Sequence, residues 1–500
     1  MGGRGHTRAT GSAEPWLSPC LAKVLSSQQI GQVDDSYNPD MTSIYAKRRA
    51  ALTAQLGAGG VAIIPTAPER SRNRDADFPY RHDSYFYYLT GFTEPNACLV
   101  LAANGHSSLF CQPKDVEREI WDGIRLGPQA APSALGVNSA HSIGELDKEL
   151  PKLLENQTSV WFPFATHDGL SAQVEGWLNQ VRGRARMGVS CPATQQDVCS
   201  LLDEMRLVKD ASEQDTMRRA ARISAGAHVR AMQLSARMLR QGQAVHEFHL
   251  EAELLHEFRL HGAQFPAYTS IVAAGANACV LHYRADTAPV RDGELVLIDA
   301  GCELDGYASD ITRTFPANGR FSGPQRALYD IVLAAQIAAA EATRPGARFN
   351  DPHEAAVRVL SQGLLDTGLL SHDKHGLLDD VLEKKAYFPF YMHRTSHWLG
   401  MDVHDCGSYI EPGEATSAPA KADPVTGAMV QPRPSRVLRE GMVLTLEPGL
   451  YVRPADGVPE AFWNIGIRIE DDAIVTANGC ELISRGVPVD PDEIEALMRG

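Results

Sequence analysis

One short segment constrains this sequence more than any other. Residues 295–298 (Leu-Val-Leu-Ile) form a continuous apolar run that ends in Asp299, and Asp310 follows eleven residues later. Such a run predicts a fully buried β-strand, and a carboxylate at its end must be paired or must bind a metal ion. The Asp-Gly dipeptide at 305–306 is typical of a tight turn, so we expect a hairpin that brings Asp299 and Asp310 roughly opposite each other. Two carboxylates that close repel unless they share a proton or a cation. The alternative for this segment alone is a solvated turn with one capping Asp.

A second segment is rich in histidine. His393, His397 and His404 fall within twelve residues, beside Trp398 and Gly400. A single histidine is more often a structural residue than a ligand, but three at this density favour a functional site. Imidazole nitrogens are common metal ligands and acid–base groups near neutral pH.

Two glutamates form the third signal. An apolar segment ends in Glu447, and residues 465–470 alternate between apolar and other side chains. Because strand side chains alternate between faces, Gly466, Arg468 and Glu470 would share one face, with the glycine leaving room for another group to approach. A surface ion pair on an amphipathic strand is the alternative for this segment alone.

The three signals together supply four carboxylates and one imidazole: Asp299, Asp310, His397, Glu447 and Glu470. This set suits two divalent cations bridged by carboxylates, and oxygen-rich ligation favours manganese-like or cobalt-like ions over a closed thiolate zinc site. Two such ions about 3.5–4 Å apart would hold a bridging water and lower its pKa.

Several separate motifs, in this order, closely resemble the Xaa-Pro aminopeptidases (aminopeptidase P). These belong to the wider pita-bread metallopeptidase family, together with prolidase and methionine aminopeptidase. The resemblance covers roughly residues 41–495, and its motifs lie at 79–84, 89–92, 278–283, 298–301, 396–400, 447–449 and 468–470. It implies an α/β N-terminal domain plus an α+β pita-bread catalytic domain, with a curved, mostly antiparallel sheet flanked by helices.

The resemblance also implies a role for each candidate ligand. Asp299 resembles the bidentate ligand of one metal, Asp310 and Glu470 the bridging carboxylates, and His397 the imidazole ligand of the other metal. Glu447 resembles a ligand that also accepts a proton from the bridging water. The implied cofactors are two divalent metal ions, manganese first, with cobalt, iron or zinc as alternatives.

Further residues match positions that contact substrate or support the metals. His282 and His404 match substrate-contacting histidines, His393 a histidine that lines the cleft, and Arg468 an arginine that supports the metal cluster. Trp121 resembles an aromatic residue that reaches a neighbouring subunit's cleft. The implied activity is hydrolysis of the bond between an N-terminal residue and a penultimate proline, by a homo-oligomer (dimer or tetramer).

Composition divides the chain into parts. Residues 1–40 are rich in Gly, Ser and Thr, and we expect a disordered extension there, with a transit peptide as the alternative. We place an N-terminal domain of the aminopeptidase P type at 41–198 and the catalytic domain at 199–500. A segment near 411–435, dense in Pro, Ala, Gly and Thr, is expected to be a surface insertion.

Local patterns predict elements in both domains. Continuous apolar runs predict strands at 61–64, 98–102, 107–111 and 160–162. Charged and apolar residues at helical spacing predict helices at 201–207 and 212–238.

Charge and cysteine content narrow the partners and the compartment. The net charge of −15 argues against binding to nucleic acid or to an anionic membrane surface, because both depend on Lys and Arg. Nine cysteines, an odd number without CxxC spacing, argue against a disulfide framework and favour a reducing compartment, so we expect a cytoplasmic protein.

Rival functions stay open at this point. Prolidase shares all five ligands and differs only in acting on Xaa-Pro dipeptides. Methionine aminopeptidase lacks a comparable first domain. A catalytically inactive peptide-binding module on the same fold is the rival from a different class, and relatives of that kind usually lose ligands. No GxxxxGK[ST] sequence supports a nucleotide-dependent enzyme.

Overall fold

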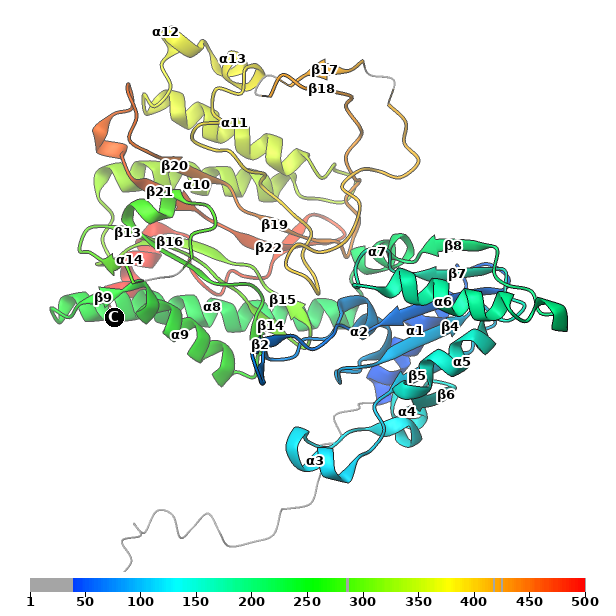
Figure 1. The fold of residues 1–500 in the computed structure, drawn as a ribbon. Helices are drawn as coiled ribbons and strands as arrows, with labels where there is room; N and C mark the ends of the chain where they lie inside the picture. Colours follow the sequence, from blue (N-terminus) through cyan, green and yellow to red (C-terminus); the bar gives the residue numbers. More distant parts are fainter. Residues whose placement is uncertain (1–38, 285–286, 417–418, 424–425, 500) are drawn as a thin grey trace, which may run out of the picture.

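The structure is a computed structural model that describes residues 39–284, 287–416, 419–423 and 426–499. Figure 1 shows two lobes, the smaller one formed by the first part of the chain. The extension expected over residues 1–40 lies outside the described residues up to position 38, and the first helix, α1, begins at Pro39.

The smaller lobe contains a six-stranded mixed sheet in the order β6-β5-β4-β1-β7-β8. Its strands are β1 (Gly60–Pro65), β4 (Cys98–Ala102), β5 (Ser107–Cys111), β6 (Ser139–Ser142), β7 (Ser159–Phe162) and β8 (Thr194–Asp197). The predicted strands at 61–64, 98–102, 107–111 and 160–162 are therefore confirmed. These strands are buried along most of their length because helices cover the sheet, which explains their continuous apolar runs.

The helices of this lobe are α1 (Pro39–Thr53), α2 (Ser84–Thr90), α3 (Val116–Asp122), α4 (Gly127–Leu135), α5 (Leu146–Leu153) and α6 (Leu170–Arg182). A short exposed hairpin, β2 (Ser71–Asn73) and β3 (Ala76–Asp77), precedes α2. The ends of α2 follow from its sequence. The Asp83 side chain accepts a hydrogen bond from the Phe86 backbone N–H at the start, and Gly91 adopts a left-handed conformation at the end.

Two helices lead into the larger lobe. They are α7 (Cys199–Leu207) and α8 (Ala211–Arg240), which confirms the helices predicted at 201–207 and 212–238. A capping box between Asp210 and Glu213 starts α8. Strand β8 ends at Asp197, immediately before α7, but the domain boundary at 198 stays a prediction.

The larger lobe is a curved, antiparallel arrangement of strands flanked by helices. All its strand pairs are antiparallel within the described residues. The strands near the site are β10 (Phe265–Pro266), β11 (Ile271–Ala274), β13 (Leu295–Asp299), β14 (Cys302–Leu304), β15 (Tyr307–Ala308), β16 (Thr312–Pro316), β19 (Val443–Leu446), β20 (Gly449–Val452), β21 (Ile465–Arg468) and β22 (Asp471–Val475). At the periphery lie β9 (Val245–His246), β12 (Pro289–Val290) and β23 (Cys480–Leu482).

Helices cover both sides of these strands (Figure 1). Helices α8 and α9 (Glu247–Leu260) lie on one side, and α10 (Gly323–Ala342) and α11 (Asp351–Asp366) on the other. The remaining helices are α12 (His372–His375), α13 (Leu378–Glu383) and α14 (Pro491–Arg499). The main apolar core fills the space between strands and helices, and it contains the fully buried Leu328, Leu360, Trp398 and Leu444. This architecture agrees with the pita-bread fold expected from the resemblance.

The segment near 411–435 is mostly exposed and contains a short hairpin, β17 (Lys421–Ala422) and β18 (Met429–Val430). Ion pairs hold its start. Glu411 accepts a hydrogen bond from Arg439 at 2.7 Å, and Glu414 pairs with Arg348 at 2.8 Å. This segment is therefore fastened to the rest of the larger lobe at its base.

Among the described residues, no helix is both long enough and apolar enough to cross a membrane. The cysteines in the same residues are all free.

Candidate metal centre

Two strands position the aspartates. Strand β13 pairs with β16, with Asp299 opposite Thr312, and Asp310 lies just before β16. The segments therefore pair as expected, but a small β14–β15 hairpin fills the turn between them. The Tyr268 hydroxyl lies 2.5 Å from Oδ1 of Asp299 and 2.5 Å from Oδ1 of Asp310, so one phenol links both carboxylates.

The glutamates come from the neighbouring strands. Glu447 follows β19 and Glu470 precedes β22, and these two strands pair with Leu446 opposite Asp471. Glu447 and Glu470 are therefore close in the fold although they are distant in sequence. The Thr312 hydroxyl donates a hydrogen bond of 2.6 Å to Oε2 of Glu470.

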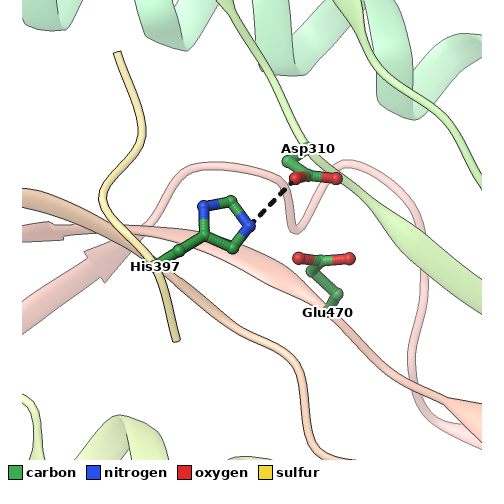
Figure 2. Close-up of side chains that lie close together, drawn as sticks. All are labelled: Asp310, His397 and Glu470. Carbon is green, nitrogen blue, oxygen red and sulfur yellow. Dashed lines mark ion pairs between the residues drawn. The ribbon is translucent and has the colours of Figure 1, made fainter. Parts of the chain in front are cut away.

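The imidazole of His397 is oriented by its own backbone. Its Nδ1 lies 2.9 Å from the Trp398 carbonyl oxygen, which can only accept, so Nδ1 carries the proton and Nε2 is free to act as a ligand. Nε2 lies 3.4 Å from Asp310, the ion pair that is dashed in Figure 2, and it lies 3.7 Å from Glu447. The Thr445 backbone N–H donates to the His397 carbonyl at 3.0 Å, which ties this segment to β19.

All five expected ligands converge on one cavity. Potential ligand atoms of Asp310, His397 and Glu470 all lie within 4.8 Å of one another. Figure 2 shows these three side chains gathered around one place. Glu447 lies next to this group because its carboxylate is 3.7 Å from Nε2 of His397. Asp299 lies next to it because the Tyr268 hydroxyl contacts both Asp299 and Asp310. All five side chains line the same cavity of 760 Å³.

The buried carboxylates of this cluster favour the binding of a cation. Burial and the neighbouring carboxylates raise the pKa of Glu470 well above its usual range. Burial also raises the pKa of Asp299, and it raises the pKa of Glu447 to about 7. Buried carboxylates must be protonated, paired or bound to metal, and this donor set of oxygens with one imidazole nitrogen fits divalent cations.

Arg468 is the cation that the chain itself supplies beside Asp299. Its Nη2 lies 2.5 Å from Oδ2 of Asp299, and its other nitrogens donate to Tyr451 at 2.9 Å and to Thr312 at 3.1 Å. Arg468 and Glu470 are both buried, which differs from the surface ion pair considered as an alternative. Arg468 therefore holds Asp299 in place while neutralising one of the four carboxylates.

Gly466 has a packing role on the same strand. A Cβ at this position would lie 2.3 Å from the Ala278 carbonyl oxygen. The group that approaches the glycine is therefore the backbone of the turn that leads to His282.

The three further histidines line the cavity, and defined side-chain contacts hold two of them. The His404 ring packs edge-on against His397, with 4.4 Å between ring centres. Nε2 of His393 lies 2.8 Å from the Tyr451 hydroxyl, and burial together with Arg468 lowers the pKa of His393 to about 3. His282 is exposed in the cavity, where a bound molecule can reach it.

The loop that carries His404 is held by buried charges. Asp405 pairs with Arg206 at 2.6 Å and with Lys209 at 2.8 Å. In the smaller lobe, Ser84 donates to Asp402 at 2.7 Å and Arg81 donates to the Met401 carbonyl at 2.7 Å. The sequence motif at 79–84 therefore contacts the larger lobe next to a cavity-lining residue.

Trp121 is not brought to this site. It lies on α3, where its side chain is 84% exposed, and it does not line the cavity. Figure 1 shows α3 standing apart from the six-stranded sheet.

Sequence reasoning missed several residues around the cluster. Tyr268 and Tyr451 lie in short segments without a chemical pattern of their own. Asp472 carried a signal, because three consecutive acids at 470–472 enter an apolar strand. Its carboxylate accepts a hydrogen bond of 3.2 Å from the Asp310 backbone N–H.

Comparison with known proteins gives consistent matches along the chain. The model for metallopeptidase family M24 matches residues 215–477, and the model for the N-terminal domain of aminopeptidase P matches residues 45–161. The Xaa-Pro aminopeptidase of Escherichia coli is 43% identical over 458 residues, which cover 91% of this chain and 97% of the relative. Human Xaa-Pro aminopeptidase 3 is 31% identical over 509 residues, covering 98% and 90%.

The solved structures agree. The aminopeptidase PepP of Pseudomonas aeruginosa superposes with a TM-score of 0.84 at 47% identity, covering 92% of this chain and 98% of that one. Fold and site thus define a metallopeptidase with an aminopeptidase P-type first domain. The chain belongs to metallopeptidase family M24 and, within it, to the Xaa-Pro aminopeptidases.

Proposed function

We propose that this chain is an exopeptidase that hydrolyses the bond between an N-terminal residue and a penultimate proline, with two divalent cations. The observation that carries the proposal is the convergence of five metal-ligand side chains in one cavity beside three histidines. The names of the relatives at 43% and 31% identity support the same substrate class.

Asp299, Asp310, His397, Glu447 and Glu470 would hold the cations. When bound, the cations polarise the scissile carbonyl and lower the pKa of an attacking water. Manganese is the first expectation, with cobalt, iron or zinc as alternatives. A zinc-substituted aminopeptidase P of Escherichia coli, at 41% identity and a TM-score of 0.82, supports a site that accepts more than one metal.

The chain's own residues then divide the remaining work. Glu447 accepts a proton from the attacking water and delivers it to the departing proline nitrogen. His282 stabilises the charge that develops on the scissile carbonyl oxygen, and His404 contacts the peptide beyond the scissile bond. His393 lines the cleft, and Arg468 keeps Asp299 in position through their ion pair.

Proline at the second position explains why a dedicated enzyme is needed. Its nitrogen carries no hydrogen within a peptide, so a peptidase that binds substrate through that N–H cannot use it. The cavity of 760 Å³ falls in the size range of sites for small molecules and short peptides.

We further propose a homo-oligomer, a dimer or tetramer, in which Trp121 reaches a neighbouring subunit. The support is that α3 and the segment just after it present exposed apolar side chains: Val116, Ile120, Trp121 and Ile124. The division into domains at 41–198 and 199–500 and a cytoplasmic location belong to the same proposal.

The test is a substrate series with the manganese-loaded protein. Release of the first residue from Ala-Pro-Leu, with none from Ala-Ala-Leu, is the expected result. Cleavage confined to Ala-Pro would identify a prolidase instead. Calorimetric uptake of metal, compared between the wild type and Asp299→Ala, separates an enzyme from an inactive module, because a module would bind peptide without taking up metal.

A further inference from the structure

The cavity is lined by two arginines that the proposed reaction does not use. Arg284 and Arg394 both line it, and both are exposed. Neither guanidinium makes a hydrogen bond or an ion pair with any part of the chain that the structure describes. Arg468, in contrast, is buried and committed to Asp299. The two arginines therefore present positive charge to a molecule bound in the cavity.

The backbone beside Arg394 is held close to the metal-ligand cluster. The Glu447 backbone N–H donates a hydrogen bond of 2.8 Å to the Thr395 carbonyl. His393 Nδ1 lies 2.7 Å from the Arg394 carbonyl oxygen. The base of the Arg394 side chain thus has a fixed place next to the strand that delivers Glu447, while its guanidinium remains free to meet a ligand.

Nearby charges leave Arg394 available. Burial and Asp351 raise the pKa of Glu354 on α11, and the positive charge of Arg394 lowers it. The side chains of Arg394 and Glu354 nevertheless form no ion pair. Lys385, which acts on His353 together with Arg394, is already paired with Asp423. An incoming anion therefore meets Arg394 without displacing a partner within the described chain.

The charge pattern orients a peptide in the cavity. Two bound divalent cations would neutralise the four carboxylates, so Arg284 and Arg394 would keep the uncompensated charge in the cavity, which repels a free ammonium group and attracts a carboxylate. In the proposed reaction the free amino end lies at the metal ligands, so the part after the scissile bond is the part that extends toward the arginines. A guanidinium binds a carboxylate through two parallel hydrogen bonds, which gives both affinity and orientation.

We propose that Arg394 and Arg284 form a carboxylate-binding subsite for the part of the peptide that follows the scissile bond. The inference rests on the proposed function, because that function defines which part of the substrate enters this region. The carboxylate is either the C-terminus of a short peptide or an acidic side chain. The subsite gives the enzyme a preference for peptides that end shortly after the proline or that carry an acidic side chain there.

The test compares three peptides that carry the carboxylate at the C-terminus, nowhere, or on the third side chain. They are Ala-Pro-Leu, its C-terminal amide, and the amide Ala-Pro-Asp-NH2. We expect a KM about tenfold lower for the free acid than for the matching amide, with kcat within about twofold. If Ala-Pro-Asp-NH2 also has the low KM, an acidic side chain can supply the carboxylate that the subsite binds. A wild type that cleaves all three with equal KM overturns the proposal.

Matched variants assign the effect to residues. Arg394→Gln and the double variant with Arg284→Gln are expected to raise KM for Ala-Pro-Leu to the value for its amide, while KM for the amide stays within about twofold. Arg320→Gln removes one exposed positive charge outside the cavity, and it should leave the preference intact. A preference that survives in both cavity variants contradicts the assignment.

Binding measured without turnover separates the two proposals. Calorimetry with Pro-Leu and Pro-Leu-amide, the pieces that follow the scissile bond, should show about tenfold tighter binding of the acid by the wild type and equal binding by Arg394→Gln. Charge-selective binding without cleavage would leave the subsite standing and remove the proposed reaction. Cleavage without charge selectivity would support the proposed reaction and contradict the carboxylate-binding subsite.

Discussion

Nη2 of Arg206 lies 2.6 Å from Oδ1 of Asp405, and the two side chains are only 2% and 1% exposed. Lys209 pairs with the other oxygen of Asp405 at 2.8 Å. Because Asp405 directly follows His404, Arg206 on helix α7 and Lys209 just after that helix fix the backbone that presents His404 to the cavity. This pairing links the start of the catalytic lobe to the place where we expect substrate to bind.

Asp405→Asn should destabilise the protein and also weaken substrate binding. The change leaves the buried Lys209 without its charged partner and leaves Arg206 with only the partly exposed Asp402, and breaking a buried pair costs about 3–5 kcal/mol. KM should rise more than kcat falls, because the His404 loop loses its anchor. Urea denaturation and steady-state kinetics measure the two effects.

Asp402→Asn is the matched control for that variant. Asp402 also pairs with Arg206, at 2.8 Å, but its side chain is 46% exposed. Its loss should cost less than about 1 kcal/mol. Equal losses in the two variants would show that burial of Asp405 does not carry the effect.

Glu470→Gln should change stability in opposite directions with and without metal. Without metal, removing one of four clustered carboxylates relieves repulsion, so the thermal midpoint should equal or exceed that of the wild type. With manganese, the wild type should gain stability through binding to the folded state, and the variant should gain less. Thermal unfolding after chelation and after reloading tests this. A variant that is less stable than the wild type in both states would contradict the repulsion argument.

His228 should contribute a measurable dependence of stability on pH. The side chain is fully buried and donates a hydrogen bond of 2.9 Å to the Ala300 carbonyl, and burial lowers its pKa to about 4. Because the unfolded chain binds this proton near pH 6.5, the stabilising contribution is complete above pH 6.5 and is lost as the pH falls toward 4.

His228→Gln keeps a donor and removes the titration. Between pH 7 and pH 5 the wild type should lose about 2 kcal/mol more of its free energy of unfolding than the variant does. Urea titrations at several pH values supply the comparison. Parallel pH profiles for the two proteins would rule out His228 as the source.

Trp121→Ala should lower the oligomeric state if α3 is an interface. Large aromatic side chains contribute heavily to the binding energy of protein interfaces, so its removal should weaken association by about 2 kcal/mol or more. Sedimentation over a range of protein concentrations measures this. Met187→Ala, at another exposed apolar residue, serves as the control. A wild type that stays monomeric at all concentrations would contradict the proposal.

The sequence predicted the site best where chemistry follows directly from a strand pattern. Asp299 and Glu447 could be found because a buried apolar run ends at each of them. Tyr268 could not, because it meets Asp299 and Asp310 across separations of 31 and 42 residues, which only the tertiary fold brings together. The contacts of the motif at 79–84 were equally hidden, since they cross from one lobe to the other.

Gly466 carries a consequence for how this molecule tolerates change. It does not line the cavity, yet any larger residue there would collide with the Ala278 carbonyl, four positions before His282. A random mutagenesis screen for activity should therefore score position 466 as almost invariant. Read without the fold, such a score would be mistaken for participation in chemistry, when its origin is steric exclusion transmitted along a neighbouring loop.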